Sequence, residues 1–190
     1  MVRDEIIETP GGSIQLRQAE PEDLEAILAV FDATLAWMNA LGNVKQWGVT
    51  PFSQLPQMVT RFRRHLEEDT VFVAVKAGEI VGAIVVTFAP PPYCWQGAEE
   101  PAAYIEPFAT APSLRGAKVG HLLLQKAAQY ALQQGRQRLR LDCFAENPVL
   151  PAYYEGAGFA PRGEFAVGDW HGRMFERLLT PGDSIPGSHP

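Results

Sequence analysis

A group of basic and small residues near the middle of the chain has the composition of an anion-binding site. Arg115, Lys118 and His121 fall at the expected start of a helix, and no acidic residue accompanies them. A helix start carries unpaired N–H groups and a partial positive charge, so cations there are unfavourable unless an anion is bound nearby. Gly116 and Gly120 would let a ligand approach the backbone closely. The pattern predicts a phosphate cradle at a helix N-terminus. The alternative is a basic, solvated helix end whose glycines serve the turn.

The apolar run before this group, residues 104–110, is expected to form an irregular strand. It contains Pro107, which cannot donate a hydrogen bond to a neighbouring strand and therefore indicates a sheet edge or a bulge. A bulge would move this strand away from its neighbour and open a cleft beside the cradle. An ordinary edge strand is the alternative interpretation.

The hydrophobic pattern predicts the elements that position these residues. Helices are expected near 20–42, 54–68, 119–135 and 148–157, and strands at 13–19, 71–76, 80–88, 104–110, 138–143, 159–167 and 171–179. The strand, helix and strand around the cradle form a unit that normally closes as a right-handed parallel crossover. We therefore expect a mixed α/β fold.

The composition is ordinary for a soluble globular protein. At 190 residues, with 46% hydrophobic and 20% charged residues, the chain fits a single domain, 1–180, and a flexible C-terminal tail, 181–190. A net charge of −6 argues against binding to nucleic acid. The N-terminal segment is too charged for a signal peptide, and no run is apolar enough to cross a membrane. Two cysteines, Cys94 and Cys143, are expected as free thiols in a cytoplasmic protein.

Two motifs and the order of elements over residues 13–180 resemble the GNAT superfamily of acyl-CoA-dependent N-acyltransferases. RGAKVG at 115–120 is similar to the family's R/Q-x-x-G-x-G/A pyrophosphate loop. Asn147-Pro148, followed by YEGAGF at 154–159, is similar to its N-x…Y-E-x-x-G-F signature. Lys118 departs from the usual glycine, which we expect to cost little if that residue is already helical.

The resemblance implies a fold and a binding mode for acetyl-CoA. The expected fold is a mostly antiparallel sheet with about four helices on its two faces. One parallel pair, 104–110 with 138–143, is expected to splay apart and hold the acyl-CoA. Backbone amides of the loop would bind the pyrophosphate, and the preceding strand would bond the pantetheine arm. The implied cofactor-binding residues are Phe108, Ala109, Thr110, Arg115, Gly116, Ala117, Lys118, Val119, Gly120, His121, Asn147 and Tyr154.

Transfer of an acetyl group to an amine also requires an acid, a base and an oxyanion donor. A phenol can donate a proton to the leaving thiolate at neutral pH, which suits Tyr154; a core tyrosine is the alternative, and Tyr153 is expected to be structural. Glu106 is the first candidate for the base. It would share a strand face with Phe108 and Thr110 by the two-residue period, unless Pro107 disturbs it. The alternative is a surface glutamate in a salt bridge. A strand amide near Thr110 or Phe108 would stabilise the oxyanion.

The acceptor pocket is expected to use aromatic residues of the first helices and of the proline-rich loop 89–97. The candidates for acceptor binding are Trp37, Trp47, Tyr93 and Trp95, with Gln46 beside them. The histidines show no metal-ligand spacing, so no metal is expected.

The resemblance thus predicts an N-acetyltransferase that moves an acetyl group from acetyl-CoA to a primary amine in a direct ternary complex. Neither cysteine falls in the two motifs, so no acyl-enzyme is expected. The alternative is a non-catalytic acyl-CoA-binding sensor or scaffold. Exposed C-terminal strands are compatible with a homodimer.

Overall fold

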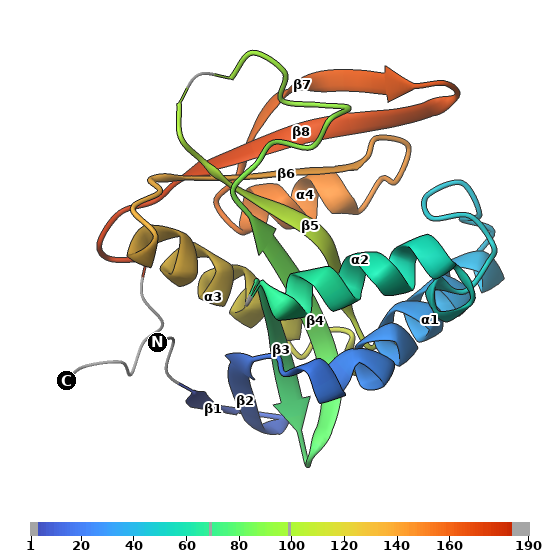
Figure 1. Cartoon of the computed structure of the whole chain (residues 1–190), viewed down its shortest axis with the longest axis vertical. Helices are drawn as coiled ribbons and strands as arrows, with labels where there is room; N and C mark the ends of the chain where they lie inside the picture. Colours follow the sequence, from blue (N-terminus) through green and yellow to red (C-terminus); the bar gives the residue numbers. More distant parts are fainter. Residues whose placement is uncertain (1–3, 69, 99, 184–190) are drawn as a thin grey trace.

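A computed structural model describes residues 4–68, 70–98 and 100–183 and contains an eight-stranded sheet (Figure 1). The strand order is β1-β2-β3-β4-β5-β6-β8-β7. The strands are β1 (Glu5–Thr9), β2 (Gly12–Gln18), β3 (Val71–Lys76), β4 (Glu79–Thr87), β5 (Ala103–Thr110), β6 (Arg138–Phe144), β7 (Ala160–Val167) and β8 (Trp170–Leu178). Neighbouring strands are antiparallel except β5 and β6, which are parallel. The predicted mixed fold with one parallel pair is confirmed.

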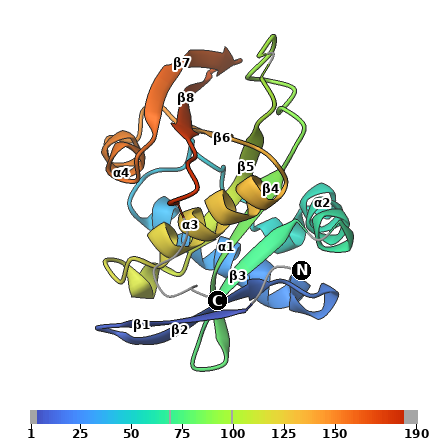
Figure 2. The same ribbon diagram turned by 90° about the vertical axis from the view of Figure 1, so that its left-hand side faces the viewer.

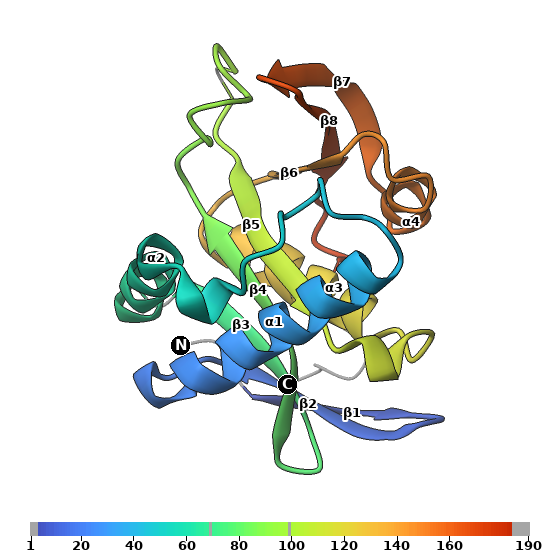
Figure 3. The same ribbon diagram turned by 90° about the vertical axis from the view of Figure 1, so that its right-hand side faces the viewer.

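Within the described residues, four α-helices cover the two faces of the sheet, as predicted (Figures 2 and 3). The helices are α1 (Leu24–Ala40), α2 (Pro56–Glu67), α3 (Val119–Gln133) and α4 (Leu150–Gly156). One core joins α1 and α2 to one sheet face through side chains such as Phe31, Phe62 and Val85. The other joins α3 and α4 to the opposite face through Leu123, Leu141 and others. The sheet is therefore the central layer of the molecule.

The first strand, β1, is absent from the sequence prediction, which begins with the strand at 13–19. β1 pairs with β2 through a tight turn that ends in the Thr9↔Gly12 pair. Gly12 has a φ of 103°, a backbone conformation that glycine adopts without strain. The turn sequence Thr-Pro-Gly-Gly is a hairpin signal that follows the apolar pair Ile6-Ile7, so this strand was within reach of sequence analysis.

The parallel pair β5–β6 is very short and opens into a splay. Only Ala103↔Leu139 and Tyr104↔Arg140 are paired, and beyond them the strands diverge (Figure 1). The β4–β5 register passes from Val85↔Glu106 to Ile84↔Phe108. Pro107 is therefore the extra residue of a β-bulge, as predicted from its missing N–H. Beyond Tyr104, the backbone N–H and C=O groups of β5 that face β6 are not paired with that strand.

The described chain ends at Asp183. Its carboxylate accepts a hydrogen bond from the Thr180 N–H at 2.6 Å and pairs with Arg177. Most of the predicted flexible tail, residues 184–190, lies outside the described residues. Among the helices of the described chain, none is both long and apolar enough to span a membrane.

Candidate active site

The predicted phosphate cradle lies at the start of α3, where the helix has no side-chain cap and no acidic residue in its first turn. The first hydrogen bond at this end runs from the Leu122 N–H to the Lys118 carbonyl, at 3.1 Å. The N–H groups of Val119, Gly120 and His121 consequently have no acceptor within the helix. Three outward N–H groups at the positive end of a helix dipole are suited to an anion such as a diphosphate.

Lys118 adopts a left-handed conformation, with φ 59° and ψ 12°. The condition for a low cost, that this residue is already helical, is not met, because Lys118 is the N-cap and turns the chain into α3. A β-carbon is strained there, which explains why glycine is the usual residue of the motif. Gly116 is also left-handed, with φ 87° and open space where a β-carbon would be. The backbone on this side of the loop is therefore accessible.

The two adjacent tyrosines of α4 point in different directions. Tyr154 is 8% exposed and packs against Phe159 and Phe175, with ring centroids at 6.0 and 5.8 Å. Tyr153 instead reaches α3: its ring lies edge-on to His121, at 4.8 Å, and its hydroxyl occupies the space beside Gly120. The tyrosine set aside as structural is thus the one that contacts the cradle, while Tyr154 lies in the core beside β6.

The bulge changes which side of the sheet Glu106 faces. Glu106 pairs with Val85, which belongs to the core under α1 and α2, whereas Phe108 pairs with Ile84, which faces α3. The prediction that Glu106 shares a face with Phe108 and Thr110 is wrong. The physical reason is that one extra residue at Pro107 reverses the two-residue alternation. On its own face, Glu106 forms an ion pair with Arg61 of α2.

A second carboxylate, Asp142 of β6, lies near Glu106 and was missed by the sequence analysis. Its Oδ1 lies 3.7 Å from the Cys94 thiol. Burial, followed by the charge of Glu106, raises the pKa of Asp142 to about 6, although Cys94, Tyr93 and Arg61 act in the opposite direction. In the sequence, Asp142 is one polar residue of an alternating strand. Only the β5–β6 register shows that it and Glu106 each lie two residues beyond the last strand pair, on the same sheet face.

The profile of the acetyltransferase (GNAT) family matches residues 35–159, which include the splay, the cradle and α4. The chain belongs to this family. As a GNAT protein it is an acyltransferase, and the family uses acetyl-CoA. The chain is 28% identical over 165 residues to the N-acetyltransferase YesJ of Bacillus subtilis, covering 84% of this chain and 87% of YesJ. It is 29% identical over 164 residues to YwnH of the same bacterium, covering 85% and 93%.

Solved structures of GNAT proteins have the same fold. An acetyltransferase of the family from Listeria monocytogenes superimposes with a TM-score of 0.71 at 20% identity, covering 92% of this chain and 100% of that one. YncA from Salmonella typhimurium, solved with acetyl-CoA, gives a TM-score of 0.65 at 13% identity, covering 88% and 95%. At identities this low, the superpositions show a shared fold and do not identify the acceptor.

The other cofactor-binding residues expected from the GNAT motifs lie in different surroundings. The Phe108 ring would lie 3.2 Å from a β-carbon at Gly120, so it contacts the cradle. Ala109 is buried on the α1 face, and the Thr110 carbonyl accepts a hydrogen bond from Thr34 at 3.2 Å. The amide of Asn147 is used within the protein: it donates to Gln46 at 2.9 Å and accepts from the Val149 N–H at 3.0 Å.

The four aromatic residues expected to bind the acceptor are dispersed. Trp37 lies beside the cradle, under the Arg115 guanidinium, at 5.5 Å. Trp47 packs against Phe31 and Phe52, in the core below α1. Trp95 lies against the buried Arg140, at 4.7 Å.

Tyr93 is the aromatic candidate that lies at the carboxylates. It is 43% exposed and stacks on Phe165 of β7, at 5.7 Å between centroids. Burial, followed by the charges of Asp142 and Glu106, raises its pKa, so the phenol stays protonated. Trp170 of β8 lies next to Phe165, at 5.8 Å, and donates its indole N–H to the Gln46 carbonyl at 3.3 Å. Tyr93, Phe165 and Trp170 therefore form an aromatic wall on the Asp142 side of the sheet, to which β7 and β8 contribute unexpectedly.

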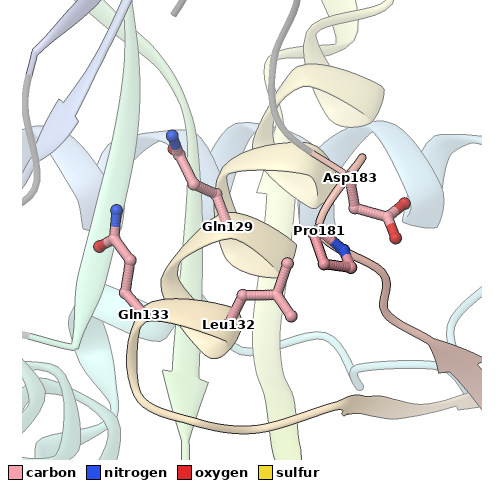
Figure 4. Close-up of a pocket in the computed structure, with 5 residues that line it drawn as sticks. All are labelled: Gln129, Leu132, Gln133, Pro181 and Asp183. Carbon is pink, nitrogen blue, oxygen red and sulfur yellow. The ribbon is translucent and has the colours of Figure 1, made fainter. Parts of the chain in front are cut away.

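A hollow of about 400 Å³ elsewhere on the surface is not part of this site. It is lined by Gln129, Leu132, Gln133, Pro181 and Asp183 (Figure 4). These residues belong to the C-terminal half of α3 and to the segment after β8, whereas the cradle is at the opposite end of the helix.

Proposed function

We propose that this protein transfers an acetyl group from acetyl-CoA to a primary amine while both are bound. The observation that carries the proposal is the splay of β5 and β6 beyond the Tyr104↔Arg140 pair, with the uncapped start of α3 on one side of the sheet and two carboxylates on the other. A thioester in the opening would meet the acceptor from the carboxylate side. Acetyl-CoA supplies an activated acetyl carbon and a thiolate leaving group.

The phosphate end of acetyl-CoA would be held by the loop before α3. The N–H groups of Val119, Gly120 and His121 would donate to the pyrophosphate, and the side chains of Arg115 and Lys118 would add positive charge. Burial and the charge of Lys118 lower the pKa of His121, so this ring is neutral at pH 7. The pantetheine arm would run along the unpaired edge of β5, where backbone N–H and C=O groups are spaced for strand-like hydrogen bonds.

Tyr154 is suited to give a proton to the thiolate. Burial, followed by the neighbouring Cys143, Tyr153 and Asp142, raises its pKa, so it carries its proton throughout the neutral range. A thiolate generated at the splay is also a stronger base in a dry site, which offsets the raised pKa of the buried phenol. The amides of β5 next to the bulge are suited to stabilise the oxyanion.

The two cysteines favour direct transfer over an acyl-enzyme. Burial raises the pKa of Cys143 to about 12, with the charge of Asp142 as the second cause, and burial also raises the pKa of Cys94. Both remain thiols at neutral pH, and the thiolate is the nucleophilic form. The amine itself is therefore the proposed nucleophile.

The test is release of free CoA thiol over a panel of primary amines, with acetyl-CoA binding measured by calorimetry. We expect thiol release with at least one amine. A Tyr154→Phe protein should bind acetyl-CoA normally and lose about 10²-fold or more in kcat. Protein incubated with acetyl-CoA alone should show no acetylated cysteine by mass spectrometry. Tight binding without turnover of any amine would favour the sensor or scaffold instead.

A further inference from the structure

Two carboxylates occupy equivalent positions on the two strands of the splay. Tyr104 and Arg140 form the last pair of β5 and β6. Glu106 and Asp142 each lie two residues beyond it, so both project from the sheet face that carries Tyr104 and Arg140. The Arg140 Nη1 donates to the Tyr104 hydroxyl at 3.1 Å, which shows that the side chains of the last pair share this face. The two carboxylates thus flank the inner end of the opening.

The two carboxylates differ in their partners. Glu106 is held by the guanidinium of Arg61 and is oriented toward α2. In the described part of the chain, Asp142 forms no ion pair, and its hydrogen-bond partners are two neutral groups, the Cys94 thiol at 3.7 Å and the Tyr93 phenol. An ion pair with a guanidinium makes a carboxylate a weaker base, whereas hydrogen bonds from neutral groups such as a thiol and a phenol lower its basicity less.

We propose that Asp142, rather than Glu106, is the base that takes the proton from the acceptor ammonium, and that the Arg61–Glu106 pair positions the acceptor. This inference rests on the proposed acetyl transfer and assigns a residue to its first step. The aromatic wall of Tyr93, Phe165 and Trp170 lies on the same side and encloses the ammonium group from that direction.

The ammonium group of the acceptor loses two protons during the transfer. The acceptor enters as R–NH3⁺, and its first proton passes to the Asp142 carboxylate, leaving R–NH2 and a neutral carboxylic acid. The nitrogen then bonds to the acetyl carbon while the carbon–sulfur bond breaks. The second proton leaves the nitrogen and, with Tyr154 as the proposed relay, ends on the sulfur. Asp142 returns its proton to water, so the products are the amide, CoA thiol and one H⁺. Desolvation lowers the pKa of the bound ammonium toward that of the carboxyl.

The groups around Asp142 bring its pKa into a range that suits a general base. Glu106 faces it from β5, Tyr93 and Cys94 from the loop before β5, and Arg61 from α2. Its partner on β8 is Met174, which is uncharged. From α4, Tyr154 is close enough for the charge of Asp142 to raise the pKa of the phenol. With a pKa of about 6, Asp142 is ionised at pH 7 yet is a stronger base than an ordinary carboxylate.

The decisive experiment is the pH dependence of kcat/KM for the best acceptor of the panel. Wild type should lose activity below about pH 6. Asp142→Asn should lower kcat/KM by about 10²–10⁴-fold and abolish this acid limb, with acetyl-CoA affinity unchanged. Glu106→Gln should raise KM yet keep the limb, shifted to lower pH, because a charge that raises the pKa of Asp142 is removed. Glu164→Gln, an exposed carboxylate of β7, should match wild type.

A second readout does not depend on activity. Carbon-13 NMR of side-chain carboxyls in the substrate-free protein should show an aspartate that titrates near pH 6, is absent in Asp142→Asn and moves to lower pH in Glu106→Gln. An Asp142 signal titrating near pH 4, or an acid limb that persists in Asp142→Asn and vanishes in Glu106→Gln, would overturn the inference while acetyl transfer stands. Wild type that releases no thiol with any amine would overturn the proposed function first.

Discussion

Lys118 is a single residue in which charge and backbone conformation act against each other. Its ammonium adds positive charge at the proposed phosphate cradle, yet its left-handed backbone is strained for any residue with a β-carbon. The glycine that usually occupies this position of the GNAT motif adopts the left-handed conformation without strain but carries no charge. Substitutions at this position can therefore separate the two effects.

Lys118→Gly should stabilise the protein by about 0.5–1 kcal/mol, because relief of the left-handed strain exceeds the added chain entropy of glycine. The same change should weaken acetyl-CoA binding several-fold at low salt, and less at high salt, because an ion pair with phosphate is lost. Urea unfolding and calorimetry measure the two quantities. Lys118→Ala is the matched control: it loses the charge and keeps the strain. If the Lys118→Gly and Lys118→Ala proteins were equally stable, the left-handed backbone at residue 118 would not be strained.

Gly120 and Tyr153 should be coupled. A β-carbon at Gly120 would collide with the Tyr153 hydroxyl, and it would lie 3.2 Å from the Phe108 ring. Gly120→Ala should therefore destabilise the protein by about 1–3 kcal/mol, the usual range for overpacking. Tyr153→Phe removes the colliding oxygen and should recover part of the loss.

Thermal unfolding of the four proteins of this double-mutant cycle gives the coupling energy directly. Additive effects would show that the hydroxyl does not occupy the space beside Gly120.

At the scale of elements, β5 shows how one proline decides the orientation of a catalytic candidate. Alternation alone places Glu106 with Phe108 and Thr110. The bulge at Pro107 instead turns Glu106 toward Arg61 on α2 and leaves Phe108 at the cradle. Neighbouring residues of one strand thereby face the proposed acceptor side and the proposed cofactor side of the site.

Helix α2 ends in a buried histidine that should make stability depend on pH. His65 is 2% exposed, and burial, followed by Arg61 and Arg64, lowers its pKa from 6.5 to about 4. Between these values the unfolded chain binds a proton that the folded protein does not, so the free energy of unfolding falls as pH falls from 6.5 to 4. The full effect is about 3 kcal/mol.

Wild type and His65→Leu should be compared by urea unfolding from pH 7 to pH 4. Thr70 keeps its bond to the carbonyl of residue 65, at 3.0 Å, in the variant. The raised pKa of Asp142 acts in the opposite direction, because the folded protein then binds the additional proton. Because both proteins contain Asp142, the difference between their free energies of unfolding reports the effect of His65 alone. If this difference in the free energy of unfolding did not change with pH, His65 would not be buried in its neutral form.

At the scale of the whole molecule, a buried ionic network joins the two C-terminal strands to the rest of the sheet. Glu176 of β8 accepts hydrogen bonds from Arg140 at 2.8 Å, Arg162 at 3.0 Å and Arg138 at 3.1 Å. Arg140 also contacts Trp95, so the loop before β5 is held by the same group. The network therefore fixes both the parallel strand β6 and the loop that carries Cys94.

Glu176→Ala should destabilise the protein by about 3–5 kcal/mol, because it removes the main partner of the buried Arg140. Arg162→Ala is the matched control: that side chain is 44% exposed, and its loss should cost less than about 1 kcal/mol.

The stabilising effect of Glu176 should also depend on pH. Burial raises the pKa of Glu176, but hydrogen bonds from Arg140 and Arg162 hold this pKa below its ordinary value. Its contribution is present above pH 4.5 and lost as pH falls toward the lowered pKa. Chemical unfolding at pH 7 and pH 4 measures both effects.

Association of copies also belongs to this scale. β7 forms one end of the sheet, and its residues are largely exposed, including Val167. An edge strand offers unpaired N–H and C=O groups to a second sheet. The homodimer and the cytoplasmic location stay predictions, and sedimentation velocity over a range of concentrations measures the first.

The sequence alone determined the order of helices and strands from β2 onward, the run of small and basic residues before α3, the irregularity at Pro107 and the resemblance to the GNAT family. These features depend on local patterns, because helical periodicity, a missing N–H and a run of small and basic residues are each written within a few positions. Only the tertiary structure decided the partners of the carboxylates, the placement of Tyr153 and Tyr154, and the left-handed turn at Lys118. Strand register and packing bring together residues far apart in the chain, such as Asp142, Cys94 and Glu106, and no local pattern encodes those distances.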